Sequence, residues 1–295
     1  MSGAAITRPG FENFVQLLGG WLLGMPLLEI NVLGPVSVRL QNCSIVPTAG
    51  KPRQVLALLA LRCGRAVSAS TLMSEIWGDA VPRSGSTTLQ TYVLQLRRRI
   101  EGSLPTGCKR TAKDLLARSY NGYQLAATPR SFDLAEFDRL AASGSAALEN
   151  CDAESASKYL GQALDLWRGP VLVDVPMGRV LAAAAAAIED ARARVLEQRI
   201  VADLHLGRHA ALIPELRKLV AAHPADENTS ALLMIALQRS GSVPRALQAF
   251  EDLRRVLADE PSACLQQLRQ ELLENPAQIK VSTYFPVERG LPQTV

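Results

Sequence analysis

The stretch Ser-Thr-Thr-Leu-Gln-Thr-Tyr-Val-Leu-Gln-Leu-Arg-Arg-Arg-Ile, residues 86–100, is the most informative part of this sequence. It contains no proline or glycine and reads as a helix of about four turns. At 100° per residue, five of its side chains fall within an arc of about 100° and form one apolar stripe. They are Leu89, Tyr92, Val93, Leu96 and Ile100. We therefore expect an amphipathic helix with one buried face.

The opposite face of this helix carries the chemistry of a DNA-reading helix. A recognition helix in the major groove needs a polar outer side, with amide and guanidinium groups for base edges and other donors for phosphates. Gln90, Gln95 and Arg98 suit base edges, whereas Ser86, Thr87 and Arg97 suit phosphates. Thr91 shares the outer face, and Leu94 at its centre fits a thymine methyl group or a dimer contact. The alternative is a solvated basic surface helix.

A hairpin follows the helix. Asn121-Gly122 lies between the runs Leu115 to Arg118 and Tyr123 to Leu125, and Asn-Gly between apolar runs predicts a tight type I′ turn. Arg118 on this hairpin is placed to enter a minor groove. Tyr123 is placed either to contact a phosphate or to pack as a strand residue.

The residues before the helix complete a known motif. Alternating short runs over residues 27–47 predict a small antiparallel sheet. A helix from Pro52 to the residue before Gly64 and a second from Ser70, expected as its cap, to Trp77 follow. Sheet, two helices, basic amphipathic helix and hairpin in this order predict a winged helix-turn-helix DNA-binding domain over residues 27–128.

Charge divides the 295-residue chain into unlike parts. Its net charge is +4, but residues 51–130 hold 13 lysines and arginines against 4 acidic residues, whereas residues 131–295 hold 17 against 22. A basic block beside an acidic half predicts that residues 51–130 bind a polyanion and that the second half binds a different kind of partner.

The second half reads as an all-α domain over residues 131–275. Seven helices are expected, with short Gly or Pro turns between them: 134–148, 153–168, 178–206, 209–223, 227–240, 244–258 and 262–274. A 34-residue repeat relates Gly207 to Gly241 and Leu216 to Phe250, and this is the tetratricopeptide period. Residues 276–295 are expected to form a tail. The predicted fold class is mainly α, an α+β winged helix followed by a tetratricopeptide-like helical domain.

The composition argues against an enzyme. The chain lacks Gly-x-Gly-x-x-Gly, Gly-x-x-x-x-Gly-Lys and Gly-x-Ser-x-Gly elements, so we expect no catalytic residues. His205 and His209 are four residues apart, but Gly207 lies between them and no Glu follows the first, so neither a metal site nor a cofactor is expected. Five scattered cysteines without a Cys-x-x-Cys pair indicate reduced thiols and a cytoplasmic protein.

The amino terminus leaves two interpretations open. The apolar stretch Phe14 to Leu28 is shorter than a membrane span and contains three glycines and Pro26, so no membrane contact is expected. Residues 1–26 are either a genuine extension, which is then expected to be disordered, or an untranslated stretch before a true start at Met25.

Several motifs resemble one family of bacterial regulators. Leu33-Gly34-Pro35, the run Leu89-Gln90-Thr91-Tyr92-Val93 and Tyr120-Asn121-Gly122-Tyr123 resemble the OmpR-type DNA-binding domain. Phe132-Asp133-Leu134 and Trp167-Arg168-Gly169-Pro170 resemble the bacterial transcriptional activation domain. Together, residues 27–275 resemble the Streptomyces antibiotic regulatory protein family, in its short form without an ATPase domain.

This resemblance implies a pathway-specific transcriptional activator for antibiotic or other secondary-metabolite biosynthesis. Such proteins bind direct repeats in double-stranded DNA near a promoter, as two protomers, and recruit RNA polymerase holoenzyme through its sigma factor. By motif position, the resemblance places the DNA contacts on eight residues: Thr87, Gln90, Thr91, Gln95, Arg97, Arg98, Arg118 and Tyr123. The competing hypotheses are a helical-repeat scaffold for other proteins and a ligand-sensing regulator, both without specific DNA readout. The operator, the pathway and the oligomeric state off DNA are left open by the sequence.

Overall fold

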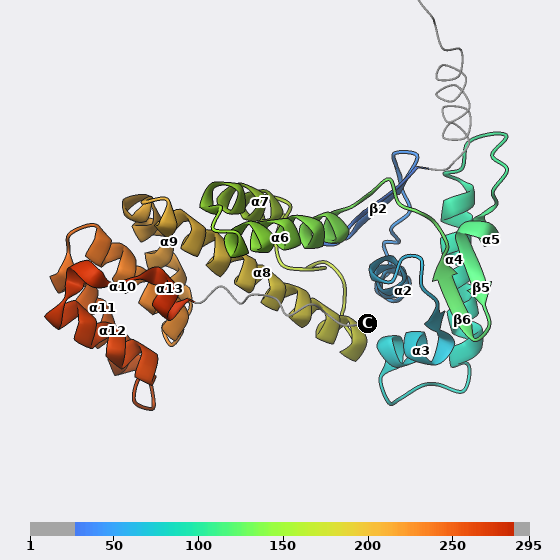
Figure 1. Cartoon of the computed structure of the whole chain (residues 1–295). Helices are drawn as coiled ribbons and strands as arrows, with labels where there is room; N and C mark the ends of the chain where they lie inside the picture. The colour runs from blue at the N-terminus through green and yellow to red at the C-terminus, as the bar shows by residue number, and fades with distance from the viewer. Residues whose placement is uncertain (1–26, 286–295) are drawn as a thin grey trace, which may run out of the picture. The chain divides into compact units, whose positions relative to one another are not determined.

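The computed structural model describes residues 27–285, so the predicted extension 1–26 and the end of the predicted tail lie outside the described residues. The chain divides into two compact units. Unit 1 comprises the chain up to Ala135 together with Trp167–Glu189, and unit 2 comprises Glu136–Leu166 and the chain from Asp190. Figure 1 shows the helices and strands of each unit.

Unit 1 begins with the predicted antiparallel hairpin. Strand β1 (Leu28–Asn31) pairs with β2 (Ser37–Leu40), and β3 (Cys43–Ser44) extends the sheet beyond β2. The side chains of Leu28, Ile30, Val38 and Leu40 are buried, because alternate residues of a strand face the same side. A fourth strand, β7 (Ser131–Phe132), pairs with β1 in parallel. A strand of two residues is too short to show an alternating pattern of apolar and polar residues, so the sequence did not predict β7.

Three helices and a second sheet form the winged helix-turn-helix. They are α2 (Gly50–Leu61), α3 (Ala69–Trp77) and α4 (Gly85–Glu101), and each contacts the other two. The short helix α5 (Ala112–Leu115) leads into a sheet of order β4-β6-β5, with β4 (Val67–Ser68), β5 (Leu116–Ser119) and β6 (Gly122–Leu125). The predicted cap of α3 is wrong by two residues. Ser68, not Ser70, accepts the Thr71 N–H at 3.0 Å.

Unit 1 also contains the Trp167-Arg168-Gly169-Pro170 motif, which the sequence analysis placed with the helical half. The Arg168 backbone N–H donates to the Leu33 carbonyl at 2.8 Å, and its guanidinium pairs with Asp133 at 3.1 Å. Asp133 also accepts the backbone N–H groups of Val32 and Leu33. Gly34 has a φ of +138°, and a Cβ there would lie 2.9 Å from the Cβ of Arg168. The three motifs that contain Gly34, Asp133 and Arg168 are far apart in the sequence but contact one another in the fold.

A buried carboxylate secures the end of this segment. Glu75 on α3 is 2% exposed and accepts the backbone N–H groups of Gly178, Val180 and Leu181 at 2.5, 2.9 and 3.0 Å. These groups belong to the start of α8 (Arg179–His205). The first N–H groups of a helix have no partner within the helix, and a carboxylate there also faces the positive end of the helix dipole. Glu75 thereby caps α8.

Unit 2 is helical, as predicted. It contains most of α6 (Asp133–Glu149), α7 (Ala153–Asp165) and the later part of α8. The remaining helices are α9 (His209–Ala222), α10 (Glu227–Arg239), α11 (Val243–Val256) and α12 (Ala263–Glu274). Helix α9 begins at His209 and α11 at Val243, which is the predicted 34-residue spacing. The preceding turns contain Gly207 and Gly241, whose φ values are +74° and +79°.

The interpretation of residue 276 onward as a tail is corrected by the structure. A 3-10 turn, η1 (Pro276–Gln278), and the short helix α13 (Val281–Tyr284) follow α12. Ile279, Val281 and Tyr284 are buried in the core of unit 2. Three apolar side chains over six residues carry no measurable period, so only their packing identifies the segment as part of the domain.

Among the described residues, no helix is long and apolar enough to cross a membrane.

Candidate nucleic-acid interface

Helix α4 has the two faces that the sequence predicts. Leu89, Val93, Leu96 and Ile100 are at most 2% exposed and pack into the core of unit 1. Tyr92 is half-buried, and its ring stacks on Trp77 with the centroids 6.4 Å apart. The apolar side of α4 is therefore held against the other helices, which fixes the orientation of its outer side.

The outer side of α4 is exposed and polar. The exposed predicted contacts on this helix are Ser86, Thr87, Gln90, Thr91, Gln95 and Arg98. Leu94 lies among them and is 49% exposed, which is high for a leucine in a folded domain. The Thr91 hydroxyl donates to the Thr87 carbonyl at 3.1 Å, so this hydroxyl already has a partner within the helix. An amphipathic helix with amides and a guanidinium on its free side can lie in a major groove.

Arg97 has a different position from its neighbours. Its Nε and Nη2 atoms donate to the carbonyl of Leu116 on β5, at 3.1 and 2.8 Å, and the residue is half-buried. A guanidinium held in this way ties helix α4 to the wing. Arg97 therefore has a positioning contact within the protein besides the phosphate contact predicted for it, because it is rotated by 100° from Arg98 on the helix.

The wing is the hairpin of β5 and β6, but its turn differs from the prediction. Ser119 pairs with Gly122, so Tyr120 and Asn121 form the tip. The predicted type I′ turn needs positive φ at both central residues, and neither has it. Gly122 is required for another reason, because a Cβ there would lie 1.9 Å from the carbonyl oxygen of Val67 on β4. The glycine permits β6 to pass close to β4.

A hollow of about 220 Å³ lies between the first turns of α4 and the wing. It brings together four of the predicted site residues: Ser86, Gln90, Arg118 and Tyr123. Thr87, Thr91, Gln95 and Arg98 do not line it and lie elsewhere on the exposed side of α4. Tyr123 is only 8% exposed, so most of its side chain packs inside the domain as a strand residue. Arg118 is opposite Tyr123 in the hairpin and is exposed.

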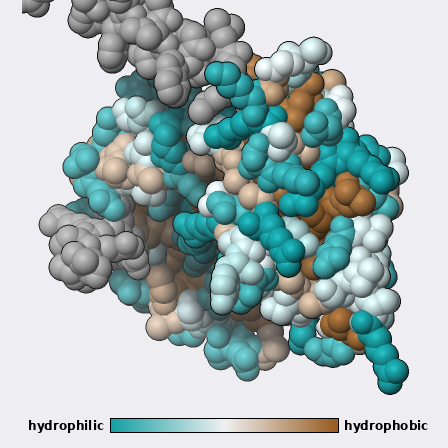
Figure 2. Space-filling model, turned by 90° about the vertical axis from the view of Figure 1, so that its right-hand side faces the viewer, coloured by the Kyte–Doolittle hydropathy of each residue, from teal (hydrophilic) through white to brown (hydrophobic). Residues whose placement is uncertain are grey.

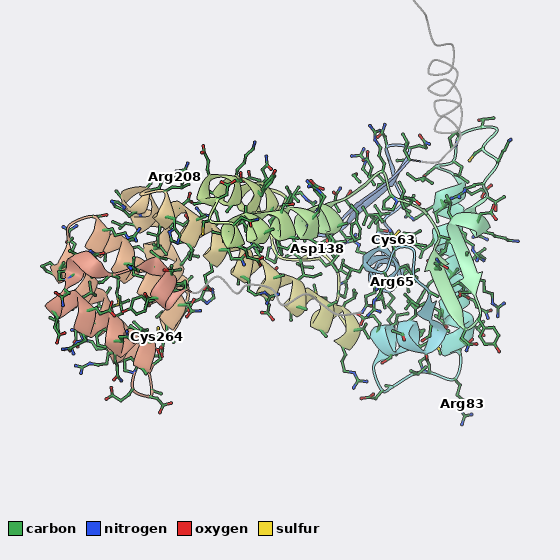
Figure 3. The ribbon with its side chains drawn as sticks, viewed as in Figure 1. Cys63, Arg65, Arg83, Asp138, Arg208 and Cys264 are labelled. Atoms are coloured by element: carbon green, nitrogen blue, oxygen red, sulfur yellow. The ribbon has the colours of Figure 1, made fainter. Side chains whose placement is uncertain are left out.

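Two further exposed residues, Tyr120 and Arg83, are not among the contacts that the sequence predicts. Tyr120 at the wing tip is 97% exposed and lines the hollow. Arg83 lies in the loop before α4, and Figure 3 shows its side chain extending away from the ribbon. The signal for Tyr120 was an aromatic residue beside a predicted hairpin turn. The signal for Arg83 was a basic residue just before the start of the recognition helix, where phosphates bind.

The four acidic residues of the block 51–130 all have partners within the protein. Glu75 caps α8, Asp79 pairs with Arg179 at 2.8 Å, and Glu101 accepts the Ala112 N–H at 3.1 Å. Asp114 accepts the backbone N–H and hydroxyl of Thr111, and these hydrogen bonds hold the pKa of the Asp114 carboxyl below its ordinary value. Because each carboxylate has a partner, the exposed arginines are left to attract a polyanion. Figure 2 shows a mostly hydrophilic surface with isolated hydrophobic spots.

Comparison with known proteins agrees with this geometry. The family model of the bacterial transcriptional activator domain matches residues 132–273, and that of the C-terminal domain of transcriptional regulatory proteins matches residues 45–111. The chain is 47% identical over 250 residues to the regulatory protein DnrI of Streptomyces peucetius, covering 83% of this chain and 92% of that protein. The chain belongs to the Streptomyces antibiotic regulatory protein family. It is a DNA-binding transcriptional regulator, not an enzyme.

Other relatives of this antibiotic regulatory protein support the assignment. The transcriptional regulator RedD of Streptomyces coelicolor is 36% identical over 274 residues, covering 90% of this chain and 77% of that protein. The solved structure of Mycobacterium tuberculosis EmbR, in complex with a low-affinity phosphopeptide, superimposes with a TM-score of 0.76 at 27% identity. That match covers 84% of this chain and 65% of the EmbR chain. The fold class predicted from the sequence, a winged helix followed by a helical domain, is confirmed.

Proposed function

We propose that this regulator is a pathway-specific activator that recognises a defined duplex DNA sequence through α4 and contacts the flanking backbone through its wing. The observation that carries the proposal is the division of α4 into a face locked in the core and an exposed face of hydroxyls, amides and Arg98. The first face fixes the helix, so the second can present the same groups to every binding site. This is the arrangement that direct readout requires.

The proposed contacts divide by chemistry. Gln95 and Arg98 read base edges, with Thr91 and Leu94 offering apolar contact to a thymine methyl. Gln90, exposed on α4 like Gln95, also reads a base edge. Ser86 and Thr87 lie on the first turn of α4, where free backbone N–H groups and the helix dipole attract a phosphate. Arg118 adds a charge from the wing. Tyr123 supports the hairpin, and only its edge at the hollow is available for contact.

Base readout is tested by Gln95→Ala and Arg98→Ala. Each variant is expected to weaken binding to the selected duplex by about 1 to 3 kcal/mol while leaving binding to a scrambled duplex nearly unchanged. The measurement is selection of duplexes from a random pool, followed by anisotropy titration on the winner and its scramble. Arg97→Ala is a matched comparison, expected to weaken both duplexes alike because it loosens β5. Equal losses on both duplexes for Gln95→Ala would remove this residue from readout.

A phosphate contact from the wing predicts a change in the salt dependence of DNA binding. Arg118→Ala is expected to reduce the slope of log K against log salt concentration by about 1, because one phosphate contact is lost. Titrations between about 50 and 200 mM salt give this slope. The control is Arg254→Ala. Arg254 is an exposed arginine of unit 2 that pairs with Glu251 at 2.9 Å, and its replacement is expected to leave the slope unchanged. An unchanged slope for Arg118→Ala would exclude the phosphate contact.

We also infer the arrangement on DNA from the family. Two protomers bind direct repeats near the promoter of an antibiotic or secondary-metabolite gene, in the cytoplasm, and recruit RNA polymerase holoenzyme through its sigma factor. The selected duplexes should then contain two repeats in the same orientation, spaced by whole helical turns. Run-off transcription with purified holoenzyme should increase when the repeats are present. Enrichment of a single half-site, or binding without added transcription, would contradict this part.

A further inference from the structure

Helices α9, α10 and α11 of unit 2 enclose a groove of about 390 Å³. Helix α10 supplies its floor through Ser230, Leu233 and Leu237, which are at most 5% exposed. Helices α9 and α11 supply its walls. The wall residues are Arg217, Val220 and Ala221 on α9, and Arg245, Gln248, Ala249 and Asp252 on α11.

The floor of the groove contains a polar group without a partner. Ser230 is 1% exposed, and its hydroxyl makes no hydrogen bond within the described residues. Leaving a buried hydroxyl unsatisfied is unfavourable, so such groups in native proteins call for an explanation. Because Ser230 lines the groove, a bound molecule can supply the missing partner.

The walls of the groove carry two arginines, Arg217 and Arg245. Neither Arg217 nor Arg245 forms an ion pair in the part of the chain that the structure describes, and both are exposed. Asp252 also lines the groove, but it accepts hydrogen bonds from Gln248 at 2.9 Å and Arg255 at 3.0 Å. Residues 131–295 carry five more acidic than basic residues, so a basic groove is unusual on this half of the chain.

We propose that this groove binds an extended segment of a partner protein in which an aspartate or glutamate side chain lies between apolar residues. Its carboxylate would pair with Arg217 and Arg245, its apolar neighbours would cover Leu233 and Leu237, and a backbone or side-chain group would bond the Ser230 hydroxyl. Arginine guanidinium groups bind carboxylates through charge-assisted hydrogen bonds. The apolar floor disfavours a nucleic acid, whose phosphate backbone offers nothing to bury there. This surface is separate from the DNA-reading helix and does not depend on it.

The test starts from peptides, because the partner is defined only by its chemistry. A display library of random 12-residue peptides is selected on the full chain, with the double variant R217E/R245E used to remove unrelated binders. We expect enrichment of peptides with Asp or Glu beside Leu, Ile, Val or Phe. The enriched peptide is then synthesised with a fluorescent label and titrated by anisotropy.

Single variants give the decisive comparison. Arg217→Glu and Arg245→Glu are each expected to weaken peptide binding about tenfold or more, because attraction becomes repulsion. Lys218→Glu changes charge equally on the same helix but does not line the groove, and is expected to change the affinity less than about twofold. Ser230→Ala is expected to weaken binding about threefold to tenfold through the lost hydrogen bond. Replacing the peptide's acidic residue with its amide should weaken binding as much as Arg245→Glu.

Three outcomes would overturn the proposal: no enrichment over the double variant, enrichment without acidic residues, or an equal loss for Lys218→Glu. Displacement of the labelled peptide by a duplex of the selected operator would assign the groove to nucleic acid instead. Thermal unfolding of each variant checks the fold, and both arginines are exposed, so their replacement is expected to leave the unfolding temperature within about 2 °C of the original.

Discussion

Glu75→Ala is expected to lower the free energy of unfolding of unit 1 by about 3 to 5 kcal/mol. The Glu75 carboxylate is buried and accepts three backbone N–H groups at the start of α8, and its side chain also accepts from Gln54 Nε2 at 3.4 Å. Truncation to alanine leaves these donors buried without an acceptor and opens a space between α3 and the start of α8. The cost is therefore that of several unsatisfied polar groups rather than of one hydrogen bond.

Urea unfolding followed by tryptophan fluorescence measures this loss, because Trp77 and Trp167 both lie in unit 1. Glu75→Gln keeps one acceptor oxygen and should lose less than the alanine variant. Asp79→Ala removes an ion pair to Arg179, the first residue of α8, in which both side chains are more than two-thirds exposed. Exposed ion pairs contribute little, so this control should lose less than about 1 kcal/mol. Equal losses for Asp79→Ala and Glu75→Ala would show that Glu75 is not the cap we describe.

Gly122→Ala is expected to displace the wing and to lower the affinity for the selected duplex and its scramble alike, by about tenfold or more. The added Cβ would lie 1.9 Å from the Val67 carbonyl oxygen and 2.7 Å from the Cα of Ser68. Both are backbone atoms, so a side-chain rotation cannot relieve the contact, and β6 must separate from β4. We expect an accompanying loss of about 2 to 4 kcal/mol in the free energy of unfolding.

The matched control for this variant is Gly161→Ala in α7. Gly161 lies in a helix, and a Cβ there meets nothing within 4 Å. Alanine is the better helix former, so this substitution should stabilise unit 2 by about 0.5 to 1 kcal/mol and leave DNA binding unchanged. Wild-type DNA affinity in Gly122→Ala would contradict the close approach of β6 to β4.

The periodic elements were predictable from the sequence because a buried helical face repeats every 3.6 residues. The seven helices expected in the second half correspond to seven helices in the structure, with ends that agree within about three residues. The faces of α4 were predicted for the same reason: its apolar stripe determines which side chains turn outward. The exposed α4 residues proposed for DNA contact follow from that stripe. The backbone contact of Arg97 and the burial of Tyr123 on the wing do not.

These two features depend on neighbours that are distant in sequence. Arg97 meets the Leu116 carbonyl because β5 returns beside α4. Tyr123 is buried on β6, a strand that packs against helices α2 and α3 as well as pairing with β4 and β5. The pattern of residue types along one sequence indicates which side chains are buried. It does not indicate which backbone group a given side chain contacts. Gly122 in the wing is an example. Its sequence context predicted a turn conformation, but in the structure the glycine allows β6 to lie close to β4.

By itself, then, the sequence determined the helical elements, the amphipathic reading helix, the division of charge and the family of this regulator. Only the tertiary structure shows that the Trp167-Arg168-Gly169-Pro170 segment packs in the same compact unit as the winged helix, where Arg168 pairs with Asp133 and Glu75 caps α8. The physical reason is that these contacts join single polar atoms of segments about 35 and 100 residues apart. Hydrophobic periodicity records burial along one element, whereas hydrogen bonds between elements exist only after the chain has folded.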